Sequence, residues 1–274
     1  KKFNGKTVIS GIDLDIAAGS TIGIIGKNGA GKTTFIKMAL GFLRPSSGNI
    51  TVFDEIPGRF PGRVGYLSER SEYHICFTGF EYLKHIASIS DPHKKNLNSY
   101  VNELIDLVGL TDSGGKKMAR YSKGMLQRLG IAQALITSPD FLILDEPFSG
   151  LDPSGQKELC DLILNLKTTK KTILICSHIL AHLEKICENV ALLHKGQIIR
   201  HERMTSILVS ENNFTLELSE IKHDFLEKLK KHFNISDTGK NKYIYKERSC
   251  GEKEILLKEI LNNGLAVNEF APLK

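Results

Sequence analysis

Apolar residues follow two alternating patterns along the first 205 residues of the chain. Short, nearly continuous apolar runs at 22–25, 141–144 and 172–176 are typical of strands that are buried on both faces of a parallel sheet. Between these runs, apolar residues recur at intervals of three and four, which predicts amphipathic helices. Strands that alternate with helices favour an α/β fold with a mainly parallel sheet.

Several weaker patterns predict the elements around this core. Alternation of apolar and polar residues over 7–16 predicts a half-buried strand, which we expect to form an antiparallel lead-in to the parallel sheet. The apolar stripe over 34–43 predicts a helix, and Lys195-Gly196 lies where a hairpin turn would join the last two strands. Short strands are also expected at 49–53, 63–69, 190–193 and 197–200.

Two segments depart from the alternating pattern. Residues 79–135 contain successive apolar stripes at helical spacing, which predicts a helical insertion within the first domain, residues 1–205. In residues 211–274, patterns of strand, helix, strand and helix follow one another, so this segment is expected to form a small α+β appendage. We interpret the appendage as an accessory domain. Alternatively, its phenylalanines could serve to cover apolar surface of the first domain.

The composition is that of an ordinary globular protein, with 41% hydrophobic and 25% charged residues. The net charge of +6 comes from residues 1–200, because residues 201–274 contain 12 basic and 12 acidic residues. Since there is no basic tail, nucleic acid is not an expected partner. No apolar run approaches the roughly 18 residues that span a bilayer, so any work at a membrane would need a partner. Lys1-Lys2-Phe3 is not followed by a signal-like apolar segment, and a cytoplasmic location is therefore expected.

A glycine-rich loop separates the first buried strand from the helix that follows it. Glycines allow a backbone to turn tightly, so that its N–H groups and the helix N-terminus can bind phosphate oxygens. Lys32 can then reach the β- and γ-phosphates, and Thr33 can ligate Mg²⁺. A plain glycine-rich turn is the alternative interpretation. The loop has the spacing G-x-x-x-x-G-K-[ST] and comprises Gly26, Lys27, Asn28, Gly29, Ala30, Gly31, Lys32 and Thr33, with Thr34 next.

Charged or titratable residues follow three of the other predicted strands. These residues are Asp145-Glu146 after 141–144, His178 after 172–176 and Glu69 at the end of 63–69. In open α/β sheets, ligands bind at the carboxyl ends of the strands. An acid there can hold Mg²⁺, and its neighbour can orient an attacking water. Asp145-Glu146-Pro147 could instead be an ordinary exit from a strand into a turn, and Glu69 a solvated loop carboxylate.

Two further motifs complete the set. Ser122-Lys123-Gly124 begins a predicted helix with Ser122 at its N-cap, and Gly150-Leu151-Asp152 forms a turn after the acidic pair. Together with the phosphate loop, the acidic pair and His178, these motifs make residues 1–205 resemble the nucleotide-binding subunit of ATP-binding cassette (ABC) transporters. The resemblance is greatest to the ATPases of bacterial two-component exporters.

The resemblance implies a catalytic role for three residues. Glu146 would be the carboxylate that orients or deprotonates the attacking water. His178 would hold the γ-phosphate and that water, and Lys32 would neutralise charge that develops during phosphoryl transfer.

The resemblance also implies the residues that bind ATP and Mg²⁺. Phe3 would stack on adenine, and Ser122 would contact the nucleotide held by a second subunit. Mg²⁺ would be held by Thr33, Glu69 and Asp145. The chain departs from the family at Tyr121, Lys123 and Met125, which replace three residues of the usual Leu-Ser-Gly-Gly-Gln signature, and at Glu69, which replaces a glutamine. The full set implied for ATP is Phe3, Gly26, Asn28, Gly29, Ala30, Gly31, Lys32, Thr33, Thr34, Glu69, Ser122, Gly124 and Asp145.

Partners and function follow from the same resemblance. Two cassettes would hold two ATP molecules at a two-fold interface, so a homodimer is expected. A transmembrane permease would place this chain on the inner face of the cell membrane, where dimer closure by ATP and opening after hydrolysis would energise export. The alternative is a soluble cassette protein that acts on ribosomes or DNA. Such proteins usually carry two cassettes or a long coiled-coil insertion, and the sequence contains neither pattern.

Overall fold

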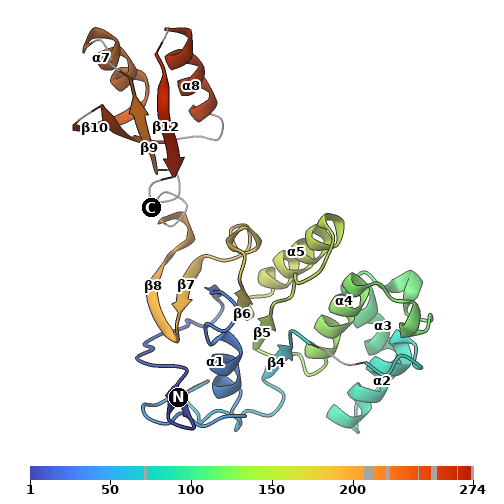
Figure 1. The fold of residues 1–274 in the computed structure, drawn as a ribbon. Coiled ribbons are helices and arrows are strands. Elements are labelled where there is room, and N and C mark those ends of the chain that lie inside the picture. The colour runs from blue at the N-terminus through green and yellow to red at the C-terminus, as the bar shows by residue number, and fades with distance from the viewer. Residues whose placement is uncertain are drawn as a thin grey trace. The chain divides into compact units, whose positions relative to one another are not determined.

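In the computed structural model, the described residues are 1–70, 73–206, 213–219, 223–239, 241–247, 252–263 and 265–272. They belong to two compact units, Lys1–Glu202 and Arg203–Lys274 (Figure 1). Each unit has its own main sheet and its own apolar core.

The first unit is built on a six-stranded sheet with the order β4-β5-β6-β3-β7-β8. The pairings that join the first five of these strands are parallel, as the continuous apolar runs predict. The turn between the last two strands consists of Lys195 and Gly196, which both have positive φ (46° and 81°), and this geometry matches a tight hairpin. The strands are β3 (Thr21–Ile25), β4 (Val64–Leu67), β5 (Phe141–Asp145), β6 (Thr172–Ser177), β7 (Asn189–His194) and β8 (Gln197–Arg203).

The register of the central strands decides where the chemistry lies. Every residue of β5 and β6 is buried, and Asp145 of β5 lies opposite Cys176 of β6. On the other side of β6, Ser177 lies opposite Ile25 of β3. Because these strands are parallel and in step, the residues that directly follow them emerge at one edge of the sheet.

Helices flank this sheet in two groups. Helix α1 (Lys32–Ala39) follows β3, and α5 (Pro153–Thr168) starts from an Asp152 N-cap. Helices α2 (Gly79–Ser90), α3 (Leu97–Leu107) and α4 (Lys123–Ala134) gather beside the β4 edge (Figure 1), where the helical pattern over 79–135 predicted them. Ser122 caps α4, as expected from the sequence.

Three sequence predictions need correction. No strand spans 7–16. At the start of the chain, β1 (Lys2–Phe3) pairs with β2 (Lys6–Thr7) in antiparallel fashion, and the stretch that follows contacts the Gly196 turn through the hydrogen bond from Ser10 N to Gly196 O. Its apolar residues still pack on the core, so the alternation reflects burial without a ladder partner. The strand predicted at 49–53 is reduced to one bridge, Val52 to Glu55. Helix α1 ends at Ala39 instead of residue 43, because Gly41 adopts positive φ.

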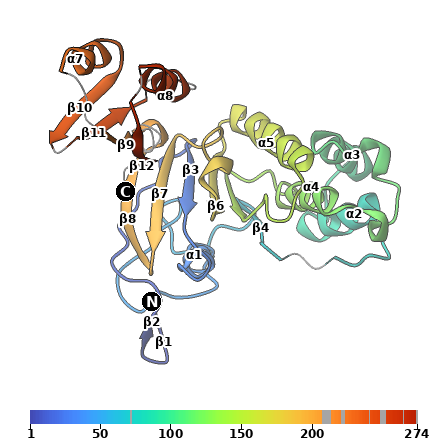
Figure 2. The same cartoon turned by 45° about the horizontal axis from the view of Figure 1, so that its top comes forward.

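The second unit is a βαββαβ arrangement in which the sheet order is β10-β11-β9-β12 and all pairs are antiparallel (Figure 2). Its core is formed by one face of the sheet and the apolar stripes of the two helices, with Tyr245 and Leu256 fully buried. The elements are β9 (Asn213–Leu218), α7 (His223–His232), β10 (Asn234–Gly239), β11 (Lys242–Lys246), α8 (Glu252–Asn262) and β12 (Val267–Pro272).

The two apolar clusters share no residue, which generates a prediction about the appendage. A chain that ends at Met204 should remain folded and bind Mg-ATP as tightly as the full chain, because its own core is intact. Size-exclusion chromatography and calorimetry would measure this. Aggregation, or weaker nucleotide binding, would instead favour the alternative that residues 211–274 cover apolar surface of the first unit.

Candidate nucleotide-binding site

The phosphate loop connects the end of β3 to the first residue of α1. Gly26 N donates to Ser177 O at 3.1 Å, which holds the start of the loop against the end of β6. Gly31 is the N-cap of α1 with φ 111°, and a Cβ there would lie 2.6 Å from Ile9 Cδ1. Only glycine fits this position, and the free N–H groups of the α1 N-terminus follow it directly.

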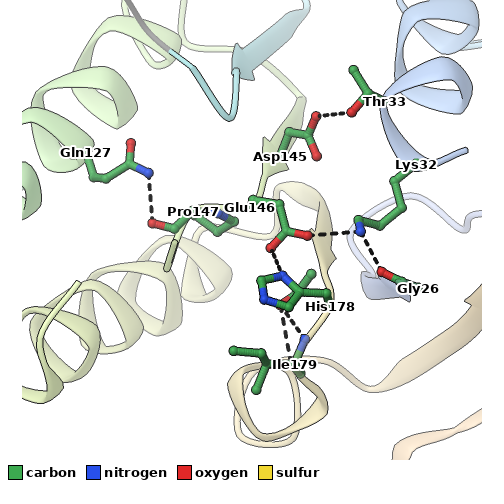
Figure 3. Close-up of polar contacts among 10 residues, drawn as sticks. Gly26, Lys32, Thr33, Gln127, Asp145, Glu146, Pro147, His178 and Ile179 are labelled. Atoms are coloured by element: carbon green, nitrogen blue, oxygen red, sulfur yellow. Dashed lines mark hydrogen bonds and ion pairs between the residues drawn. The ribbon is translucent and has the colours of Figure 1, made fainter. Parts of the chain in front are cut away.

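A buried ion pair lies beside the loop. The Lys32 side chain is only 7% exposed, and its Nζ donates to Gly26 O and lies 3.0 Å from Glu146 Oε1 (Figure 3). The other carboxylate oxygen of Glu146 lies 2.9 Å from His178 Nδ1. The three residues predicted to be catalytic therefore form one connected group, although they come from three separate strand ends.

Asp145 is the second acid of the site. Its Oδ2 accepts a 3.1 Å hydrogen bond from Thr33 Oγ1, whereas Oδ1 is buried and has no partner among the described residues. Burial raises the pKa of Asp145 to about 6; the bond from Thr33 opposes the shift, and the charges of Glu69 and Glu146 add to it. The environment thus disfavours the charged carboxylate unless a cation joins it.

The oxygens of Asp145 and Thr33 suit a hard divalent cation. Mg²⁺ prefers oxygen ligands, and proteins usually supply one or two carboxylates while phosphates and waters complete the shell. The described residues contain no group of three or more His, Cys, Asp or Glu side chains placed to hold a metal. The donor set therefore fits a cation that arrives with a nucleotide better than a metal held by protein ligands alone.

Other predicted residues lie away from this group. Glu69 is exposed beyond the end of β4, and its negative charge contributes to the raised pKa of Asp145. The hydroxyl of Ser122 accepts from Met125 N at 3.2 Å, and Gly124 lies in the first turn of the same helix. Phe3 is 39% exposed, with Lys1 Nζ 5.1 Å from its ring centre. Within the part of the chain that the structure describes, no hydrogen bond joins Ser122 or Phe3 to the phosphate loop.

Sequence reasoning missed Gln127, a buried residue of α4. Its Nε2 donates to Pro147 O at 3.1 Å, directly after Glu146 (Figure 3). One signal was available: Gln127 lies on the buried stripe of α4 that continues through Ile131 and Ala134. A polar residue on a buried stripe requires a partner, and the sequence does not say which.

Comparisons with known proteins agree with this geometry. A sequence profile described as "ABC transporter" matches residues 9–149. An uncharacterized ABC transporter ATP-binding protein of Nostoc sp. is 42% identical over 220 residues, covering 78% of this chain and 66% of that protein. The bacitracin transport ATP-binding protein BcrA of Bacillus licheniformis is 33% identical over 284 residues, covering 97% of this chain and 89% of that protein. The matches to the Nostoc, Synechocystis and Bacillus subtilis YdbJ proteins span 60–66% of those proteins' own length.

Solved structures show the same fold. The cbiO1 structure from Clostridium perfringens matches with a TM-score of 0.69 at 24% identity, over 75% of this chain and 85% of that one. An ATP binding subunit of an ABC transporter matches with a TM-score of 0.64 at 28% identity, over 75% and 87% of the two chains.

The phosphate loop, its buried lysine and the acids at the strand ends define a P-loop nucleotide-binding protein. The comparisons then narrow the class: the chain belongs to the ABC transporter ATP-binding family. The family and the α/β cassette fold predicted from the motifs are both confirmed.

The pKa of Asp145 generates a prediction about stability. Because the folded pKa of about 6 lies above the ordinary value of 3.8, the folded protein binds more protons than the unfolded chain between these pH values, and its stability falls as pH rises through them. Without metal or nucleotide, Asp145→Asn should therefore be more stable than the natural chain at pH 8, by on the order of 2 kcal/mol. This difference in the free energy of unfolding should shrink towards pH 4. Urea unfolding at pH 8 and pH 4 measures it, and an equal difference at both pH values would contradict a raised pKa of Asp145.

Proposed function

We propose that this protein is the ATP-binding and ATP-hydrolysing subunit of a membrane transporter, and that the transporter is an exporter. The observation that carries the proposal is the convergence of Lys32, Glu146 and His178 beside a phosphate loop at one edge of the sheet. Thr33 and Asp145 lie at the same edge with oxygens that suit Mg²⁺. These are the parts that phosphoryl transfer to water requires.

Each side chain has a distinct task in this proposal. The backbone N–H groups of the loop and Lys32 bind the phosphates. Glu146 orients the attacking water and accepts its proton, and His178, already within hydrogen-bond distance of Glu146, holds the water and the γ-phosphate. Mg²⁺ would be held by Thr33, Asp145 and Glu69, and when bound it neutralises charge on the phosphate oxygens.

The ion pair between Lys32 and Glu146 has a consequence for substrate binding. The ammonium of Lys32 forms an ion pair with Glu146 and donates a hydrogen bond to Gly26 O. A γ-phosphate must compete with the Glu146 carboxylate for this ammonium, and the two anions repel each other. Binding of ATP therefore favours a shift of Glu146 away from Lys32, towards the position from which it can reach water.

A second copy of the chain would complete each site. Ser122 and Gly124 lie at the exposed start of α4 and bind no group of their own phosphate loop, which supports a role towards the nucleotide of a partner subunit. A homodimer with two-fold symmetry satisfies both sites at once. In the proposed dimer Phe3 stacks on adenine, since its ring is partly exposed.

The transmembrane partner is proposed to be a permease. No helix within the described ranges is long and apolar enough to cross a bilayer. A pocket of about 340 Å³ is formed by the segment directly before α2 and by α2 itself, and Ile75 in that segment is exposed. Its lining residues are His74, Phe77, Tyr82, His85 and Ile86. Exposed apolar surface of this kind supports docking of another protein. The similarity to two proteins named as bacitracin transport ATP-binding proteins supports export, with this chain on the inner face of the membrane.

Replacement of Glu146 by glutamine tests the catalytic assignment. The variant should keep Mg-ATP binding and lose turnover by at least about 100-fold, because it removes the general base and preserves the shape of the side chain. It should also elute as a dimer with Mg-ATP, since one repelling charge near the γ-phosphate is gone. Size-exclusion chromatography and phosphate release measure the two effects.

Lys32→Ala serves as the control, because it should abolish ATP binding at millimolar concentrations and leave the protein monomeric with ATP. If Glu146→Gln hydrolyses ATP at the normal rate and stays monomeric with Mg-ATP, Glu146 is not the catalytic carboxylate.

The transport role has a separate test. The tagged native protein, purified from detergent-solubilised membranes, should carry with it a polytopic membrane protein. Recovery of ribosomes or DNA in place of a permease would contradict the transport role and favour a soluble cassette protein.

A further inference from the structure

The loop that follows Glu146 packs along the first turns of α4. Gln127 Nε2 donates to Pro147 O at 3.1 Å, and a Cβ on Gly124 would contact Leu151 at 3.8 Å. At Gly150, with φ +68°, an added Cβ would collide with Lys123 Nζ, so the lysine side chain lies directly against this glycine. Three positions of α4, all within five residues of Ser122, therefore touch the segment 147–151.

Among these contacts, the one made by Gln127 is a buried hydrogen bond. The residue is only 5% exposed, and its amide nitrogen donates to a main-chain carbonyl, so the bond fixes both partners with little competition from water. Tertiary structure alone brings the two together, because they are 20 positions apart in the sequence.

The carbonyl that Gln127 holds belongs to a strained corner of the backbone. Glu146 has φ 49°, a left-handed conformation that is unfavourable for a residue with a Cβ and persists only where neighbours enforce it. Its N–H donates to Cys176 O at 2.9 Å, and its own carbonyl accepts from Ser149 N at 3.1 Å. The bond from Gln127 holds the carbonyl of the peptide between Pro147 and Phe148. Because the ring of Pro147 fixes its φ, this bond also restricts the backbone at Glu146, one residue earlier.

We propose that Gln127 is a positioning residue for hydrolysis, which holds the corner at Glu146 and Pro147 in the orientation that aims the Glu146 carboxylate. The proposal rests on the role of Glu146 under the proposed function. Gln127 lies five residues after Ser122 in one rigid helix, a distance of about 7.5 Å along the axis. If α4 moves when Ser122 binds the second subunit's nucleotide, Gln127 moves with it. Its side-chain amide then shifts the backbone at Glu146 and Pro147 in the same subunit.

Two glutamines of the same helix provide a matched pair of variants. Gln127→Met removes the bond to Pro147, whereas Gln133→Met removes the 2.8 Å bond in which Tyr82 donates to Gln133 Oε1, away from Glu146. In the full-length protein, Gln127→Met should lower kcat for Mg-ATP about tenfold and leave KM within about twofold. Gln133→Met should leave both within about twofold. In Gln127→Asn, the amide is one methylene too short, so its kcat should lie between those of the natural chain and Gln127→Met. This variant replaces Gln127→Met in the test if Gln127→Met does not fold.

Combination with Glu146→Gln separates positioning from general loss of structure. If Gln127 acts through Glu146, adding Gln127→Met to Glu146→Gln should reduce single-turnover hydrolysis by less than about twofold further. Two outcomes would overturn the positioning role of Gln127 and leave the role of Glu146 intact. One is a tenfold lower single-turnover rate in the double variant than in Glu146→Gln. The other is an equal kcat for Gln127→Met and Gln133→Met while Glu146→Gln is inactive. Normal turnover by Glu146→Gln overturns this proposal together with the catalytic assignment of Glu146.

Discussion

The ion pair between Lys32 and Glu146 is the interaction on which the arrangement of the site depends. Both side chains are about 7% exposed and lie 3.0 Å apart, so each charge is stabilised mainly by the other. Removing one partner of a buried pair leaves an uncompensated charge that costs about 3–5 kcal/mol. The pair also extends to Gly26 O on one side and His178 on the other. Under the proposed function, a phosphate that binds at the loop would therefore change the contacts of all three side chains, and substrate binding would be coupled to the position of Glu146, the proposed general base.

This ion pair exists because of the register of a parallel sheet. Lys32, Glu146 and His178 lie far apart in the chain, but each follows directly after the carboxyl end of a strand or the loop that extends it. The pairings of β3, β5 and β6 are in step, and their side chains are buried on both faces. Burial of two acids and a lysine at this edge costs free energy, which is offset by the continuous apolar core of the same sheet.

Helix α4 gives the site a second level of organisation. Its start carries Ser122 and Gly124, which are proposed to act on a partner's nucleotide, and its fifth residue, Gln127, donates a hydrogen bond to the carbonyl of Pro147, the residue after Glu146. One helix thus contacts the segment that follows Glu146, the proposed general base, and has an exposed N-terminus. The second unit, Arg203–Lys274, has its own sheet and its own apolar core.

Sequence and tertiary structure determined different parts of this protein. The spacing from Gly26 to Thr33 predicted the loop, because glycine, lysine and a hydroxyl must occur there in a fixed order to bind phosphate. Apolar runs predicted β5 and β6, since a strand buried on both faces leaves a local signal, and the residues next in sequence gave the candidates Asp145, Glu146 and His178. The strand predicted over 7–16 was wrong because alternation records burial and not the presence of a ladder partner. Only the fold could place Glu146 against Lys32, raise the pKa of Asp145 or join Gln127 to Pro147, because each depends on contacts between residues distant in sequence.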